Sequence, residues 1–194
     1  STANATRGQL LGVNPVARND ENLLSYRAGL VFKPAEAGTV YLSWANSKTP
    51  SKASVNGTCT PTSTTGTANC NVDAETAINL ELGTKWELLD KRLALTAAMF
   101  RNERRNYRVA DPGNPLNPSG EQQLDGRARV DGLALGVAGT LLPGWQLFAN
   151  YTYLDSQVVR GVSVSCFDNP SAACGNSATD RDPFAGNPLT NTPK

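Results

Sequence analysis

Apolar and polar residues alternate with a period of two along six stretches of this chain. The clearest examples are Ile78, Leu80 and Leu82, and then Leu93 and Leu95, each separated from the next by a single residue. A β-strand places successive side chains on opposite faces, so this period indicates strands with one apolar face, and not helices with a period of 3.6. Six strands are predicted: the first two cover 23–33 and 39–48, the third ends before 88, the fourth begins at 92, the fifth ends near 141 and the sixth begins at 145.

The segments between these strands are of two kinds. Short turns are predicted at 34–38, 88–91 and 142–144, and long polar segments at 1–22, 49–74, 109–121 and 159–194. Short and long segments alternate, so all the long loops fall at one end of an antiparallel up-and-down meander. Outer-membrane barrels have short periplasmic turns and long exterior loops. The turns are therefore predicted to be periplasmic, the long segments to be exterior loops, and 159–194 to lead to a further strand.

Composition limits the possible functions. The 194 residues carry a net charge of +1, which gives no electrostatic basis for nucleic-acid binding. No apolar run approaches the roughly 18 residues that a membrane helix needs. A mean hydropathy of −0.36 is still compatible with a barrel, because lumen-facing and lipid-facing residues alternate. The chain has no histidine, which removes His-based catalytic triads, and no enzyme motif occurs, so we do not expect an enzyme.

Four cysteines fall into two local pairs. Cys59 and Cys70 bracket one Thr- and Ser-rich segment, and Cys166 and Cys174 bracket another polar segment. The spacing differs from that of zinc sites and histidine ligands are lacking, so two loop disulfides and no metal site are expected. Proximity alone suggests the pairing, and three pairings are formally possible. Disulfides imply an oxidising compartment such as the periplasm or the cell exterior.

Two stretches of the sequence carry a family resemblance. ETAINLELGTKWELLDKRLALTAAMFRNE, from residue 75, and RVDGLALGVAGTLLPGWQLFANYTYLDS, from residue 129, resemble barrel strands of TonB-dependent siderophore receptors, most closely the catecholate type. Residues 25–51 and 186–194 are similar to neighbouring segments of the same barrels. The resemblance implies a 22-stranded, plugged barrel in the bacterial outer membrane that imports a ferric siderophore. About six strands would come from this chain, which is then an internal fragment of the barrel.

The resemblance also implies the partners. A ferric siderophore would be the transported ligand, with no covalently bound cofactor, and TonB would act through a plug domain that this chain lacks. The outer surface would meet outer-membrane lipid and lipopolysaccharide. Two alternatives stay open: a passive porin or adhesin barrel without TonB coupling, and a soluble secreted β-sandwich stapled by disulfides.

Candidate binding residues lie in RNERRNYR, residues 101–108, at the loop end of the fourth strand. Strict alternation from the lipid-facing Leu93 sends one set toward the lumen, where guanidinium groups would attract and stack on an anionic iron catecholate: Asn102, Arg104, Asn106 and Arg108. The same alternation sends the other set outward: Arg101, Glu103, Arg105 and Tyr107. Ion pairing, plug contacts or lipopolysaccharide phosphate are the alternative roles for these arginines. Phe167 and Phe184 are weaker candidates for closing over a ligand.

Overall fold

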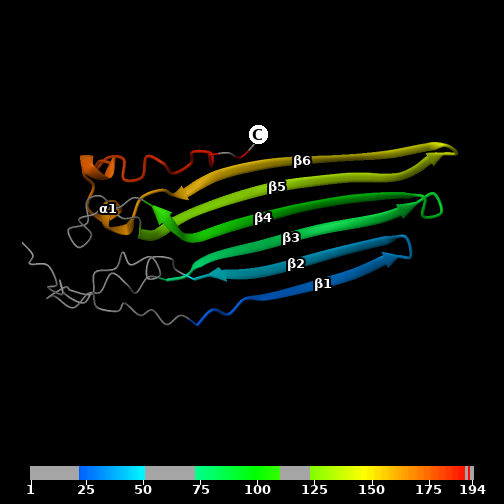
Figure 1. Cartoon of the computed structure of the whole chain (residues 1–194), viewed down its shortest axis with the longest axis horizontal. Helices are drawn as coiled ribbons and strands as arrows, with labels where there is room; N and C mark the ends of the chain where they lie inside the picture. The colour runs from blue at the N-terminus through cyan, green and yellow to red at the C-terminus, as the bar shows by residue number, and fades with distance from the viewer. Residues whose placement is uncertain (1–21, 51–72, 110–122, 191, 193–194) are drawn as a thin grey trace, which may run out of the picture.

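The computed structural model describes residues 22–50, 73–109, 123–190 and 192. These residues form one antiparallel sheet in which every strand pairs with the next in sequence (Figure 1). The elements are β1 (Tyr26–Ala35), β2 (Gly38–Thr49), β3 (Glu75–Leu88), β4 (Leu93–Val109), β5 (Gln123–Leu142), β6 (Trp145–Arg160), helix α1 (Val164–Asp168) and the 3-10 turn η1 (Ala172–Cys174). The predicted six-stranded meander is therefore confirmed.

Connections of unequal length join the strands. Residues 36–37, 89–92 and 143–144 make short connections, and these lie together at one end of the sheet (Figure 1). The opposite end carries α1 and the segment that returns along β6. Most of the residues in the other predicted loops, including Cys59 and Cys70, lie outside the described residues.

The strand register gathers apolar side chains on one face. One row crosses all six strands through direct Cα partners: Leu30, Leu42, Leu82, Met99, Leu133 and Tyr153. Next to it runs a second such row: Phe32, Val40, Thr84, Ala97, Leu135 and Tyr151. We call this side of the sheet the apolar face. Its side chains are open, with Leu30 75 % and Met99 58 % exposed, so the face requires apolar surroundings that the described residues do not supply.

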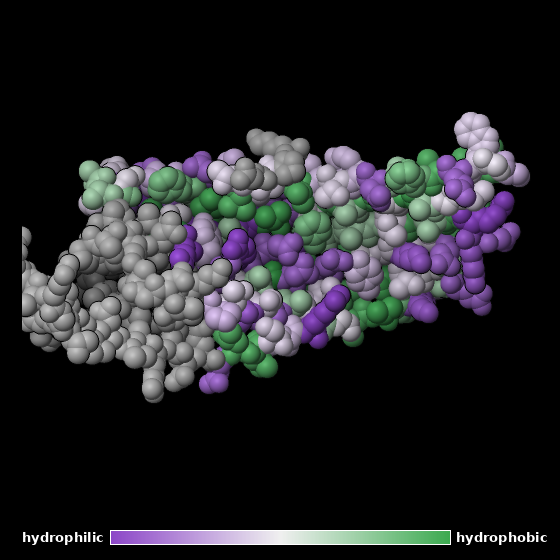
Figure 2. Space-filling view, viewed as in Figure 1, coloured by the Kyte–Doolittle hydropathy of each residue, from purple (hydrophilic) through white to green (hydrophobic). Residues whose placement is uncertain are grey.

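The other side, the polar face, holds ring-over-glycine pairs. Phe100 lies opposite Gly132, and a Cβ added to Gly132 would collide with the Phe100 ring. Tyr41 covers Gly83 in the same way and donates a hydrogen bond to Glu81 Oε1 (2.6 Å). Figure 2 shows one face of the molecule, with hydrophilic residues spread along the middle of the sheet. The glycines are thus places where an aromatic ring lies flat against the backbone.

The described residues contain no second sheet packed on the first. A soluble β-sandwich would bury its apolar face against such a layer. Among the described helices, none has the length and apolar character to cross a membrane. Several strand ends differ from prediction by a few residues. The largest difference is at the start of β1, which begins at Tyr26, so that residues 23–25 precede it without joining the ladder.

Candidate functional site

A β-bulge near the loop end of β4 decides which side chains share the polar face. Asn106 has a left-handed backbone (φ 59°), and the register with β5 shifts between Arg105 and Tyr107. Its side-chain amide donates to the Ala74 carbonyl oxygen (3.2 Å). Asparagine tolerates this conformation better than most residues. The extra residue reverses the alternation, so Tyr107 turns to the face that carries Arg104.

Arg104 occupies an open position on the polar face. Its direct neighbours on β3 and β5 are Ala77 and Ala128, whose small side chains leave space above them. The guanidinium donates through Nε to Glu75 Oε1 (2.8 Å), and an Nη donates to the same oxygen. Arginine has five N–H groups, so three are left beyond these two bonds. The side chain is 59 % exposed and held in place, which suits it to bind an anion.

Tyr107 completes this cluster. The Arg104 guanidinium carbon lies 5.9 Å from the centroid of the Tyr107 ring, within cation–π range. The ring covers Gly126, where an added Cβ would approach it to 2.7 Å. The phenol donates to the Arg160 carbonyl oxygen (3.2 Å), which connects β4 to the end of β6. We call Glu75, Arg104 and Tyr107 the loop-end cluster.

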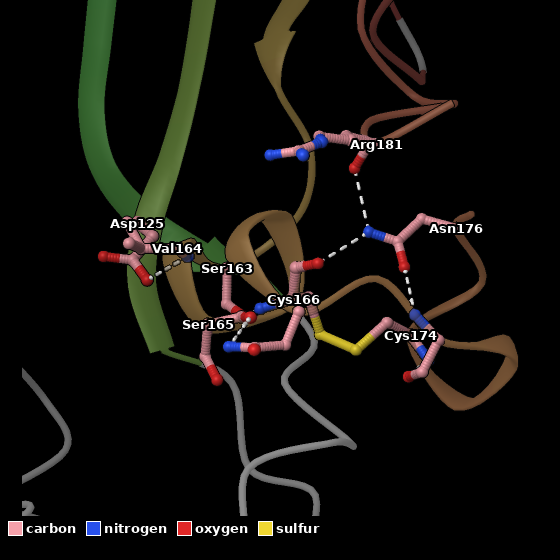
Figure 3. The surroundings of a disulfide bond; sticks show 10 residues. Asp125, Ser163, Val164, Ser165, Cys166, Cys174, Asn176 and Arg181 are labelled. Atoms are coloured by element: carbon pink, nitrogen blue, oxygen red, sulfur yellow. Dashed lines mark hydrogen bonds between the residues drawn. A yellow bond between two sulfur atoms is a disulfide. The ribbon is translucent and has the colours of Figure 1, made fainter. Parts of the chain in front are cut away.

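The segment 161–187 beyond β6 is compact and stapled (Figure 3). Cys166 and Cys174 form a disulfide, as predicted, and Ser163 caps α1 by accepting from the Cys166 N–H (3.1 Å). The buried Asn176 side chain donates to the carbonyl oxygens of Cys166 and Arg181 (2.8 Å each). The side-chain amide of Asn176 thus joins α1 to the backbone at Arg181.

Contacts with β5 and β6 fix this segment to the sheet. Asp125 accepts from the Val164 N–H (2.9 Å) and so ties α1 to β5. Val158 exchanges two 2.8 Å backbone hydrogen bonds, one with Gly186 and one with Asn187. The chain therefore returns beside β6, as Figure 1 also shows.

Phe167 lies between two cations of this segment. Its ring centroid is 5.5 Å from the Arg160 guanidinium carbon and 5.8 Å from that of Arg181. Phe184 is 47 % exposed and packs against Gly161. Phe167 is thus already engaged by two arginines, and Phe184 is the more open of the two rings.

The predicted site residues separate into two groups. Asn102 and Arg104 share the polar face, and Asn102 accepts from Asn79 Nδ2 (2.7 Å). Asn106 forms the bulge itself. The register shifts again between Tyr107 and Arg108, so the lumenal position expected for Arg108 stays a prediction. Tyr107 was expected to point away from Arg104, which is wrong, because its ring covers Gly126 and lies against the Arg104 guanidinium. The cause is the bulge, which strict alternation does not include.

Comparison with known proteins agrees with this architecture. The family model described as "TonB dependent receptor-like, beta-barrel" matches residues 1–194. The chain is 37 % identical to the probable TonB-dependent siderophore receptor PiuA of Acinetobacter baumannii, over 92 % of this chain and 22 % of the relative. It is 33 % identical to the catecholate siderophore receptor Fiu of Escherichia coli K12, over 74 % of this chain and 18 % of the relative.

Solved structures give the same result. The crystal structure of the ferric-catecholate import receptor Fiu from E. coli K12 superposes with a TM-score of 0.55 at 32 % identity, covering 72 % of this chain and 19 % of that one. The ferripyoverdine receptor of Pseudomonas aeruginosa gives a TM-score of 0.55 at 25 % identity, and the match covers 74 % of this chain and 18 % of that one. This chain spans about a fifth of the length of the curated relatives it matches.

Proposed function

Because the chain belongs to the TonB-dependent receptor β-barrel family, we propose that it supplies six adjacent strands to an outer-membrane receptor that imports a ferric siderophore of the catecholate type. The family consists of outer-membrane receptors and not of enzymes. In this proposal the apolar face meets lipid and outer-membrane lipopolysaccharide, and the polar face lines the lumen. The short turns are periplasmic, and TonB acts through a plug domain.

The loop-end cluster is the observation that carries the choice of ligand. An iron atom chelated by three catecholates is an anion with aromatic rings. The free N–H groups of Arg104 offer charge-assisted hydrogen bonds to its oxygens, and the guanidinium plane and the Tyr107 ring offer stacking surfaces. A hydroxamate complex of iron presents neither feature to the same degree. The Fiu relatives are named catecholate receptors, which supports the same ligand class.

Other relatives are named as receptors for other metal carriers. The metal-pseudopaline receptor CntO of P. aeruginosa is 35 % identical to this chain, and the match covers 54 % of this chain and 14 % of that relative. The barrel wall alone is therefore shared among ligand classes, and the discriminating observation is the side-chain chemistry at the loop end. The passive porin or adhesin alternative gains no support from the described residues, because nothing in them favours it over the family match.

A pair of adjacent arginines tests the proposal. In the full-length outer-membrane protein, Arg104→Gln removes a lumenal charge and Arg105→Gln removes the neighbouring charge from the other face. We expect Arg104→Gln to weaken binding of a synthetic iron(III) tris-catecholate by about tenfold or more, since a hydrogen bond to a charged group contributes about 1.5–3 kcal/mol. Arg105→Gln should stay within about twofold. Tighter binding of an iron(III) tris-hydroxamate than of the catecholate would overturn the ligand class.

A further inference from the structure

One peptide group joins the stapled segment 161–187 to the loop-end cluster. The carbonyl oxygen of Arg160 accepts a hydrogen bond from the Tyr107 phenol (3.2 Å), and the N–H of Gly161 donates to Asp182 Oδ2 (2.9 Å). This oxygen and this N–H belong to the same planar peptide bond. The peptide between Arg160 and Gly161 is therefore held at both of its polar ends, by Tyr107 at one and by Asp182 at the other.

Tyr107 reaches this peptide across β5. Its Cα partner on β5 is Gly126, and the next residue, Arg127, pairs with Arg160 on β6. The ring lies over Gly126, where an added Cβ would come within 2.7 Å of it. The absence of a side chain at Gly126 thus leaves room for the ring to pass from β4 to the end of β6.

Gly161 allows a second close approach, from the stapled segment. A Cβ added to Gly161 would collide with the Phe184 side chain and would approach Asp182 Oδ1 to 3.3 Å. Val162 and Ser163, which follow, are buried, so the chain enters the interior of the segment at this point. The peptide before Gly161 thus lies at the junction between β6 and the stapled segment, in direct contact with residues 182–184.

The Asp182 carboxylate is used by backbone donors. Its Oδ2 accepts from Gly161, and its Oδ1 accepts from the Phe184 N–H (3.3 Å). In the described part of the chain it forms no ion pair, and the neighbouring Arg181 lies over the Phe167 ring. A hydrogen bond to a charged acceptor is about twice as strong as one between neutral groups. The half-buried carboxylate therefore fixes the orientation of the Gly161 N–H.

The effect of Asp182 passes through the peptide to Tyr107. An acceptor at the N–H polarises the amide and makes its carbonyl oxygen a better acceptor, because hydrogen bonds in a chain strengthen one another. The phenol proton is then committed to the Arg160 carbonyl oxygen. The ring is held beside Arg104, whose guanidinium carbon lies 5.9 Å from the ring centroid. The hydroxyl of Tyr107 thus serves as an anchor, and its ring serves as the stacking surface.

We propose that Asp182 is a positioning residue for ligand binding, which fixes the Tyr107 ring beside Arg104 through the Arg160–Gly161 peptide. This role rests on the proposed import function, and it adds to that function a residue that touches no ligand and still sets the affinity of the loop-end cluster. Because the ring is held in its stacking position before the ligand arrives, ordering it costs no affinity. The stapled segment is then part of the binding machinery.

A double-mutant cycle in the full-length outer-membrane protein tests this coupling, with an iron(III) tris-catecholate as the probe. Asp182→Ala removes the acceptor for Gly161, and Tyr107→Phe removes the hydroxyl but keeps the ring, so we expect each to weaken binding about fivefold. Both changes act through one peptide, so the double variant should also lose about fivefold, whereas independent effects would multiply to about 25-fold. Asp182→Asn keeps an acceptor oxygen and should stay within about twofold of the native protein.

Hydrogen exchange at the Gly161 amide reports the same coupling without any ligand, and mass spectrometry measures it. We expect exchange to be about tenfold faster in Asp182→Ala and about threefold faster in Tyr107→Phe, because either change frees the peptide. The matched control Asp180→Ala removes an exposed acid of the same segment, and it should alter exchange and binding by less than about twofold. Heat-modifiable migration on a gel verifies that every variant folds.

Three results would overturn the proposal: losses that multiply in the double variant, an unchanged Gly161 exchange rate in Tyr107→Phe, or an equal loss of binding in Asp180→Ala. Failure of the native protein to bind the tris-catecholate would instead refute the import proposal for this ligand class. The exchange rates would then still decide whether Asp182 positions Tyr107, which separates the two proposals.

Discussion

Arg104 and Tyr107 lie three positions apart on one strand and yet share a face, with the guanidinium carbon 5.9 Å from the ring centroid. In a regular strand, residues three apart point to opposite faces. The bulge at Asn106 removes that constraint and brings a cation, a phenol and the carboxylate of Glu75 together at the loop end of the sheet. Bulges at barrel rims commonly re-aim a side chain in this way.

The first prediction concerns the bulge itself. Asn106→Val places a β-branched residue at φ 59°, which costs about 1–2 kcal/mol, so we expect the bulge to relax and Tyr107 to leave Arg104. Binding of an iron(III) tris-catecholate, followed by quenching of tryptophan fluorescence, should weaken by about tenfold. Asn106→Gly accepts the same backbone and should stay within about threefold. Equal loss in both variants would show that the asparagine side chain matters and the bulge does not.

A second prediction tests the ring-over-glycine contact of the polar face. Gly132→Val would drive its side chain into the Phe100 ring, and we expect the free energy of unfolding in lipid vesicles to fall by about 1–3 kcal/mol. Ala134→Val adds bulk on the same face, opposite Ala98, and should cost less than about 1 kcal/mol. Urea titration of the folded protein measures both. If the two variants are equally stable, Phe100 does not lie against the glycine.

The staple in segment 161–187 gives a third prediction. The disulfide joins residues eight apart, and Cys166→Ser/Cys174→Ser should remove about 2–3 kcal/mol of local stability. Tryptic cleavage after Arg181 should then become roughly tenfold faster or more, because local opening exposes the backbone. Ala173→Ser, within the same loop, keeps both cysteines and should leave the cleavage rate unchanged. An unchanged rate in the cysteine variant would mean that the Asn176 hydrogen bonds hold the segment without the disulfide.

The alternation of apolar and polar residues in the sequence was sufficient to predict the antiparallel sheet. Leu82 and Met99 keep period two on strands joined by a short connection, so their neighbouring positions followed once the turn was located. The start of β1 was less predictable, since Leu23 and Leu24 continue the apolar pattern without joining the ladder. The pattern of apolar and polar residues reports the character of the side chains, whereas the end of a strand also depends on whether its backbone finds hydrogen-bond partners on a neighbouring strand.

The site was harder to predict because its geometry depends on one irregular residue. No glycine or proline marks the bulge in RNERRNYR, and asparagine at 106 was the only local signal. The Glu75 partner of Arg104 is 29 residues away and depends on the β3–β4 register. The disulfide of Cys166 was predictable from spacing, but the role of Asn176 was not, because its bonds join segments whose positions only the fold determines.

The central claim is that this sheet is a barrel wall with lipid on its apolar face and the lumen on its polar face. Spin labels on cysteines introduced singly at positions 95–99 of β4, in the full-length protein in bilayers, measure this directly, with the unsubstituted protein as background. We expect labels at 95, 97 and 99 to be accessible to oxygen dissolved in the lipid, and labels at 96 and 98 to be shielded from it. Accessibility without a period of two, or with the opposite phase, would contradict the account.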